Sequence, residues 1–179
     1  MTQFKESRLL FEFGDRWRVF KLDEHRDYRE RIGKLDETKA VDFLGILDDK
    51  ELYFIEVKNY RGDRIESKDK LLKGELQQEL AQKVRDSVAC IIGAYCTSSE
   101  PEHWVPYAKL LCNKKKERRV ILWLEYELPS HPSSRKKMMA FFNVRGFKQK
   151  LTWLTSHVYV ESMSKQRLPD LKVSNLPQP

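Results

Sequence analysis

Three charged residues fall inside two apolar stretches in the first half of the sequence. Asp42 lies within "AVDFLGI", whereas Glu56 and Lys58 lie within "YFIEVK". Short runs rich in Val, Ile and Phe predict β-strands, here at about 40–47 and 51–58, with "LDDKE" as the turn between them. Because burying a lone charge is costly, such residues persist where they pair with each other, bind a metal ion or take part in catalysis.

The alternation of side chains along a strand predicts that these charges share one face. Residues two apart point to the same side, so Glu56 and Lys58 lie together, and Asp42 joins them if the strands pair as a hairpin. A hard divalent ion such as Mg²⁺ or Mn²⁺ relieves the repulsion between two carboxylates, and the carbonyl of Val57 is a further candidate ligand. A water acidified by the ion can attack a phosphodiester, while a nearby Lys stabilises the developing charge.

A purely structural interpretation of these residues is also open. Glu56 and Lys58 can be a solvent-facing ion pair on an edge strand, and Asp42 can begin a turn. Against this interpretation, each acidic residue has apolar neighbours on both sides, and the charges fall in the middle of the predicted strands rather than at their ends.

The pattern "AVDFLGI…LYFIEVKNY", followed by a long amphipathic helix, resembles the PD-(D/E)XK nuclease superfamily, which includes restriction endonucleases. The resemblance covers about residues 24–127. It implies that Asp42 and Glu56 bind the metal and that Lys58 is the catalytic Lys. The two acidic residues are 14 positions apart, which suits a hairpin. Val41 stands where many members have Pro, a departure that many other members share.

The resemblance also implies two further contributions to the site. Members often add an acidic residue from the first helix, and Glu24, Asp27 and Glu30 compete for that role. The helix after the second strand often carries a polar residue that faces the site. Gln82 is the candidate, as a contact to a metal ligand or a phosphate, with a solvent-facing Gln as the alternative.

The remaining elements place this pair of strands in a single domain spanning 1–179. We expect an α/β (α+β) fold with a restriction-endonuclease-like core, in which helices flank a central mixed sheet of four to five strands. The core covers about 24–127, and a basic C-terminal extension covers about 128–179. The fourth core strand is expected at 119–128, and the third comes from the N-terminal hairpin.

Periodicity and turn residues predict the other elements. The apolar stripe of the long helix is made of Leu76, Leu80, Val84, Val88, Ile91, Ile92 and Tyr95. The expected elements are two strands around Gly14–Asp15 within 8–21, a helix over 23–32 with Asp23 as N-cap, the long helix over 75–95, a short helix over 106–113, a helix within 135–147, a strand over 157–163 and an extended, partly frayed tail.

The net charge of +7 is unevenly distributed along the chain. Residues 1–100 hold 19 Lys and Arg against 21 Asp and Glu, a net of −2, whereas residues 101–179 hold 15 against 6, a net of +9. Basic clusters suit a polyanion such as nucleic acid, although a solvated surface is the alternative for any one of them. The candidate nucleic-acid-binding residues are Lys114, Lys115, Lys116, Arg118, Arg119, Arg135, Lys136 and Lys137.

Other chemistries find little support in the sequence. The four His residues are far apart, and neither a phosphate-binding Gly-rich motif nor a nucleophile motif is present. The three Cys residues show no metal-site spacing, which fits reduced thiols in a cytoplasmic protein. No apolar run approaches the length of a membrane span, so no membrane partner is expected.

The sequence therefore predicts a cytoplasmic, Mg²⁺-dependent endonuclease that hydrolyses DNA phosphodiester bonds. RNA as a substrate and a homodimeric state remain open. The alternative function is that of a catalytically silent protein that keeps the nuclease fold and binds nucleic acid or another partner.

Overall fold

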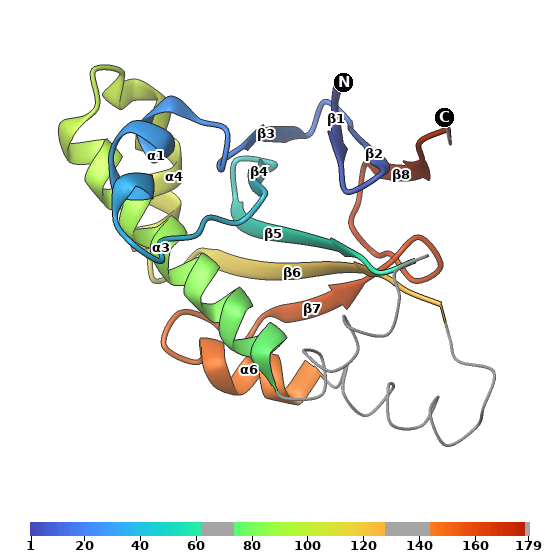
Figure 1. Cartoon of the computed structure of the whole chain (residues 1–179). Coiled ribbons are helices and arrows are strands. Elements are labelled where there is room, and N and C mark those ends of the chain that lie inside the picture. Colours follow the sequence, from blue (N-terminus) through green and yellow to red (C-terminus); the bar gives the residue numbers. More distant parts are fainter. Residues whose placement is uncertain (62–73, 128–143, 178–179) are drawn as a thin grey trace.

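Two β-sheets and a layer of helices make up the fold (Figure 1). The computed structural model describes residues 1–61, 74–127 and 144–177. The larger sheet has the strand order β3-β4-β5-β6-β7. Its strands are β3 (Trp17–Lys21), β4 (Phe43–Leu47), β5 (Glu51–Asn59), β6 (Glu117–Glu125) and β7 (Val158–Glu161).

This larger sheet is mixed, as the sequence predicts. Strands β3, β4 and β5 are antiparallel neighbours, whereas β5, β6 and β7 run parallel. The central strands β5 and β6 carry long apolar runs that are buried on both faces, as parallel central strands usually are. The mixed α+β class is therefore confirmed, and the strand expected at 119–128 lies beside β5.

The smaller sheet has three antiparallel strands in the order β1-β2-β8. They are β1 (Thr2–Glu6), β2 (Leu9–Phe13) and β8 (Leu171–Asn175). The two strands expected within 8–21 are present as β2 and β3, but they do not pair as a hairpin, because they join different sheets. At Gly14, between these strands, an added Cβ would lie 2.1 Å from a carboxylate oxygen of Asp170, so a side chain would collide there.

The tail is not frayed up to residue 175, because β8 pairs with β2 along its whole length. β1 was not expected at all. The β1–β2 turn consists of Ser7 and Arg8, with φ of 49° and 66°, and such turns usually carry Asn or Gly. The sequence therefore gives no turn signal at this position.

The helices described all pack against one face of the larger sheet (Figure 1). They are α1 (Arg26–Glu30), the short 3₁₀ helix η1 (Ile32–Lys34), α3 (Glu75–Thr97), α4 (Pro101–Cys112) and α6 (Val144–Leu151). The smaller sheet covers the other face, where Phe11 packs against Phe43 and Trp123. The expectation of helices flanking the sheet therefore holds for one face only.

Three details of the helices differ from the sequence predictions. The N-cap of α1 is His25 rather than Asp23, and its ring nitrogen accepts a hydrogen bond from Asp27 N–H. Helix α4 begins at Pro101, a residue well suited to a first helical turn, and continues through Pro106. The helix expected within 135–147 falls mainly on residues outside the described ranges.

Candidate active site

The pairing register of β4 and β5 places Asp42 opposite Glu56. Phe43 pairs with Ile55 and Leu44 with Phe54, so one further step along the register brings the two acidic residues together. Leu44 and Phe54 belong to the core on the helix side of the sheet. Because opposite residues of an antiparallel pair point to the same face, both carboxylates face α3.

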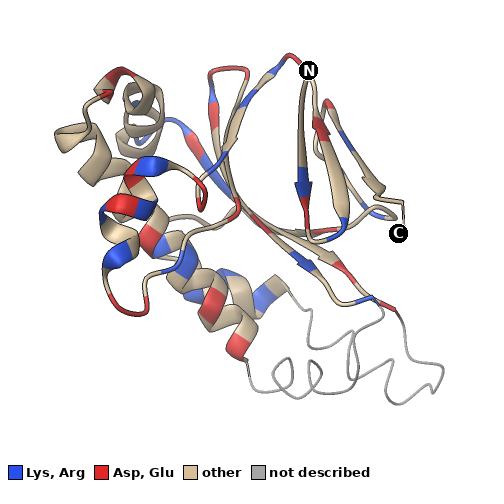
Figure 2. Ribbon diagram, turned by 45° about the horizontal axis from the view of Figure 1, so that its top comes forward, with Lys and Arg blue, Asp and Glu red and all other residues tan. Residues whose placement is uncertain are grey.

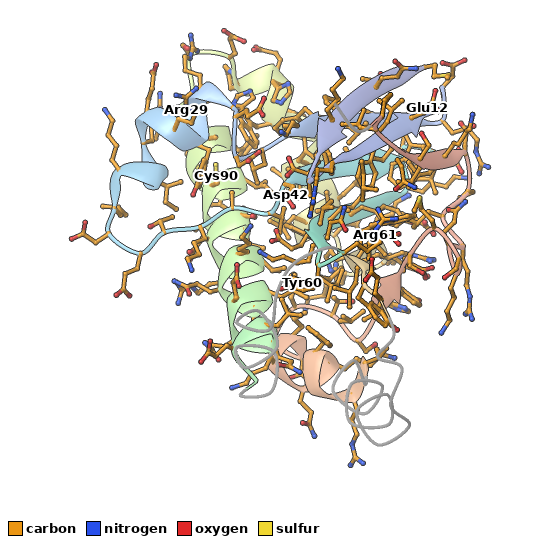
Figure 3. The ribbon with its side chains drawn as sticks, turned by 45° about the vertical axis from the view of Figure 1, so that its right-hand side comes forward. Glu12, Arg29, Asp42, Tyr60, Arg61 and Cys90 are labelled. Atoms are coloured by element: carbon orange, nitrogen blue, oxygen red, sulfur yellow. The ribbon has the colours of Figure 1, made fainter. Side chains whose placement is uncertain are left out.

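Asp42 is held at the start of β4 by hydrogen bonds on two sides. Its carboxylate oxygen Oδ2 accepts a hydrogen bond from Val57 N–H at 2.6 Å, and its main-chain carbonyl accepts one from Leu22 N–H at 3.0 Å. Asp42 is only 7% exposed, and Figure 3 shows it between α3 and the strands. The N–H and C=O groups of one strand residue point toward the same neighbouring strand. Because Val57 N–H points to Asp42, the Val57 carbonyl is directed to the same side.

Lys58 lies on the same face and bridges two carboxylates. Its ammonium nitrogen is 3.1 Å from Glu56 Oε1 and 2.9 Å from Glu79 Oε1. Glu79 comes from the first turns of α3, so the helix supplies a second acidic partner for the Lys. The structure therefore brings Asp42, Glu56 and Lys58 together, as their spacing predicts.

A second ammonium group, from Lys83 on α3, lies between the two strand carboxylates. Its Nζ is 2.7 Å from Glu56 Oε1, 2.8 Å from Glu56 Oε2 and 3.8 Å from Asp42 Oδ1. Sequence reasoning missed both Lys83 and Glu79. The available signal was their i,i+4 spacing beside the apolar positions Leu80 and Val84, which puts both charges on one side of the helix.

Gln82, the residue expected to face the site from this helix, points elsewhere. Its side-chain amide donates a hydrogen bond to the carbonyl of Glu37 at 2.7 Å, so it ties α3 to the loop before β4. Residues 82 and 83 differ by about 100° around the helix axis, and only the second of them reaches the carboxylates.

Burial makes the two carboxylates poor acids. The pKa of Glu56 is raised to about 7 by burial and by the charge of Asp42, which together outweigh the two ammonium groups. Burial also raises the pKa of Asp42, although Lys83 and the Val57 N–H oppose the shift. For Lys58, burial alone would lower the pKa, but Glu56 and Glu79 reverse the effect and raise it. The site therefore holds paired carboxylates that favour a nearby positive charge.

The structure places none of the three first-helix candidates against Asp42. Glu24 pairs with Lys21, Glu30 is exposed, and Asp27 accepts hydrogen bonds in a separate buried network near α4. Besides Glu56, the acidic residues that act on this part of the site are Glu6, which raises the pKa of Asp42, and Asp23, whose own pKa is raised to about 6 by burial and by the Asp42 charge.

Asp23 reaches the site through the pairing of β3 with β4. Lys21 pairs with Phe43, so the chain leaving β3 runs beside Asp42, where Leu22 N–H binds the Asp42 carbonyl. Asp23 Oδ1 is buried and has no hydrogen-bond partner among the described residues. From the sequence alone, Asp23 is predicted to be a helix cap, because an Asp before a polar helix is a common cap.

The oxygen donors at the site fit a hard cation of the Mg²⁺ type. Mg²⁺ in proteins commonly binds one or two carboxylates and keeps several waters, and Asp42, Glu56 and the Val57 carbonyl offer such a set. Across residues 1–61, 74–127 and 144–177, no group of three or more His, Cys, Asp or Glu gathers as a metal centre. The donor set therefore suits an ion with a largely aqueous shell rather than one enclosed by protein ligands.

The predicted basic residues lie away from these carboxylates. Lys114, Lys115 and Lys116 form the turn before β6, whose first residue, Glu117, pairs with Glu51 at the start of β5. The five residues from there to Glu56 span about 17 Å. This basic turn and the carboxylates thus occupy opposite ends of the same strands.

The other predicted basic residues have separate positions. Arg118 donates a hydrogen bond to the Asn113 carbonyl, and Arg119 forms ion pairs with Glu51 and Glu117. Because Arg119 pairs with two carboxylates of the sheet, we assign it a structural role in β6. Arg135, Lys136 and Lys137 lie outside the described residues.

Two other arginines lie at the carboxylate end of the sheet. The Arg8 guanidinium donates to the Arg61 carbonyl at 2.9 Å, and the Asn59 amide donates to the Ser7 carbonyl at 2.8 Å. These contacts dock the β1–β2 turn against the end of β5, where Figure 3 labels Tyr60 and Arg61. Figure 2 shows that α3 carries both Lys or Arg and Asp or Glu residues.

Comparisons of the chain with models of protein families, with curated proteins and with solved structures gave no match. Within the described part of the chain, every helix is too short or too polar to cross a membrane. The interpretation of the site therefore depends on its own geometry.

The raised pKa of Glu56 predicts that the metal-free protein loses stability as the pH rises. Between the ordinary pKa of 4.5 and the raised value of about 7, the folded chain binds more protons than the unfolded chain. The free energy of unfolding should therefore fall by about 3 kcal/mol across this window. Urea unfolding in the presence of a chelator, from pH 4 to 8, measures the change.

The control for this prediction is Glu56→Gln, which removes the titrating group and keeps the side-chain shape. The difference between the wild-type and variant pH profiles isolates the contribution of Glu56 from that of other carboxylates. Superimposable profiles would show that Glu56 ionises in the folded protein as easily as in the unfolded chain.

Proposed function

We propose that this chain is a Mg²⁺- or Mn²⁺-dependent nuclease with a PD-(D/E)XK-type core, which hydrolyses DNA phosphodiester bonds. One observation carries the proposal: Asp42 and Glu56 face each other on two buried strands, with Lys58 two residues further on the same face. The mixed sheet, with a long helix over this face, supports the same conclusion.

Each residue has a distinct role in the proposed reaction. Asp42, Glu56 and the Val57 carbonyl would hold the ion, which when bound supplies an acidified water as nucleophile. Lys58 keeps its ammonium beside Glu56, where it stabilises the negative charge that develops on the phosphate. Glu79 accepts a hydrogen bond from Lys58 and fixes the direction of its side chain.

A second candidate function is a silent protein with the same fold that binds nucleic acid without cutting it. Lys83 favours this alternative, because its ammonium already neutralises both carboxylates. A closed network of ion pairs between α3 and the sheet is also a way to satisfy buried charges with no ion present.

The deciding experiment incubates the full chain with a panel of labelled nucleic acids in Mn²⁺ or Mg²⁺. The panel contains linear duplex, branched, single-stranded and circular DNA, with RNA as a separate arm, and products are resolved on a denaturing gel. Metal-dependent cutting of any DNA supports the proposal. Binding without cutting under all conditions supports the silent alternative.

Reversing the basic turn should weaken DNA binding without abolishing it. Charge reversal at Lys114, Lys115 and Lys116 should weaken binding to all sequences alike and flatten its salt dependence by up to about three units on a log–log plot. The turn lies about 17 Å from the carboxylates, so it would contact phosphates roughly five base pairs from the bond that is cut.

The matched control reverses three dispersed, exposed basic residues, namely Lys5, Arg29 and Lys34, and so changes the net charge by the same amount. Binding is measured by fluorescence anisotropy from low to physiological salt. Equal losses in both triple variants would show that net charge alone, and no local surface at the turn, attracts the DNA.

A further inference from the structure

Lys83 occupies the position in which a metal ion would contact Glu56. Its ammonium nitrogen is within 2.8 Å of both Glu56 carboxylate oxygens and 3.8 Å from Asp42. Only 14% of the Lys83 side chain is exposed, so the group is enclosed by the site rather than lying at its rim. Among the described Lys and Arg residues, Lys83 is the one that forms an ion pair with each of these carboxylates.

The ammonium and a divalent ion cannot share this position. Mg²⁺ binds carboxylate oxygens at about 2.0–2.1 Å, so an ion on Glu56 would enter the space that the Lys83 ammonium fills. Two like charges a few ångströms apart in a buried site also repel strongly. Loading the site with metal therefore requires Lys83 to move.

Glu79 offers Lys83 an alternative partner. The two residues are four apart on α3, the spacing at which helix side chains of opposite charge meet. Glu79 is about one-third exposed and already accepts a hydrogen bond from Lys58 through Oε1. A small rotation of the Lys83 side chain toward the start of α3 would transfer its charge from the strand carboxylates to Glu79.

We propose that Lys83 is a built-in cation that fills the site in the absence of metal and withdraws to Glu79 when metal binds. Lys83 thereby sets the metal concentration at which the site fills. This inference depends on the proposed metal-binding function. It assigns to Glu79 and Lys83, rather than to an additional ligand, the control of the affinity of the site for the metal ion. Lys83 is a positioning residue, since it acts on the ion through Glu56.

Calorimetric titration of the full chain with Mn²⁺ tests the inference without measuring cleavage. Lys83→Met, which keeps an unbranched side chain one atom shorter and removes its charge, should bind Mn²⁺ at least about tenfold more tightly. Glu79→Gln, which removes the alternative partner, should bind it several-fold more weakly. The control Arg85→Met removes an exposed positive charge from the same helix and should leave the affinity unchanged.

Thermal unfolding with and without Mn²⁺ gives a second readout. Lys83→Met leaves Lys58 as the one ion-pair partner of Glu56 among the described residues, so the metal-free variant should melt at a lower temperature than the wild type. Mn²⁺ should then raise its melting temperature by more than it raises that of the wild type. Lys83→Gln provides a polar neutral variant if the Met variant does not fold. Glu79→Gln keeps the ammonium groups of Lys58 and Lys83 but removes the carboxylate to which Lys83 would withdraw. It therefore tests the coupling between this withdrawal and metal binding.

The outcomes separate this inference from the proposed function. If Lys83→Met binds Mn²⁺ no more tightly than the wild type, while Glu56→Gln loses binding, Lys83 does not compete with the ion and the inference fails alone. If neither the wild type nor Lys83→Met binds Mn²⁺ at millimolar concentration, the metal site and the inference fail together.

Discussion

Replacing Asp42 by Asn or Glu56 by Gln is expected to abolish cleavage and metal binding while leaving the fold in place. Each change removes one of the two negative charges that face each other across β4 and β5. The Asn oxygen can still accept the hydrogen bond from Val57 N–H, so the start of β4 stays anchored. Removing a carboxylate with a raised pKa also removes a buried charge, which limits any loss of stability in the metal-free protein.

Three measurements on the same preparations make this prediction decisive. A gel assay follows cleavage, calorimetry follows Mn²⁺ binding, and circular dichroism follows the fold. Asp49→Asn is the matched control, because this exposed residue lies in the turn at the other end of β4 and β5. If both site variants cleave like the wild type, Asp42 and Glu56 belong to a structural ion cluster and the nuclease proposal is wrong.

Replacing Lys58 by Ala is expected to slow cleavage by about 10²–10³ while metal binding persists. The Lys58 ammonium lies beside Glu56 but is not an oxygen donor, so its loss leaves the ligand set complete. The charge that develops on the phosphate would then lose its nearest compensating group. The metal-free variant should also be less stable, because Glu79 would lose its ion pair with Lys58 and Glu56 would keep Lys83 as its one ion-pair partner among the described residues.

Single-turnover kinetics separate this role from a structural one. We expect the loss in the rate constant of the chemical step, with the DNA affinity unchanged. Lys50→Ala, at an exposed position in the β4–β5 turn, controls for the removal of a Lys from the same pair of strands. A Lys58 variant that loses Mn²⁺ affinity as completely as Glu56→Gln would show that the Lys only holds the carboxylate in place.

The strands of the site could be predicted from the sequence because their signals are local. Alternation within "YFIEVK" puts Glu56 and Lys58 on one face, and a short turn restricts how β4 can pair with β5. The contribution of α3 was harder to predict. Gln82 and Lys83 lie on adjacent positions at the edge of the apolar stripe, and the choice between them depends on the rotation of the helix against the sheet.

The same rotation explains why two apolar residues assigned to the stripe of α3 are partly exposed. Ile92 is 38% exposed and Tyr95 is 45% exposed, whereas Ser87 and Ala94 are buried. Ser87 is buried because it faces the chain before β4, where its hydroxyl oxygen accepts a hydrogen bond from Val41 N–H. A prediction from the large apolar residues alone therefore rotates the buried face of α3 slightly away from its position in the structure.

Long-range strand pairing was the least predictable part. β8 pairs with β2 although some 160 positions separate them, as in the register of Phe11 with Val173. No local pattern specifies such a pairing. Asp23 was missed for a related reason, since its place beside Asp42 follows from the pairing of β3 with β4 rather than from its own surroundings in the sequence.

The position of β8 has a consequence for the order of events during synthesis. A ribosome releases β1 to β7 before it releases Leu171–Asn175, so the small sheet lacks its third strand until after the larger sheet has been synthesised. Until then, the apolar surface that carries Phe43, Tyr53 and Trp123 has only an incomplete cover. A nascent chain in this state is exposed to aggregation and is a natural client for chaperones. β8, which is synthesised after the other described strands, thus completes the cover over the apolar cluster between the two sheets.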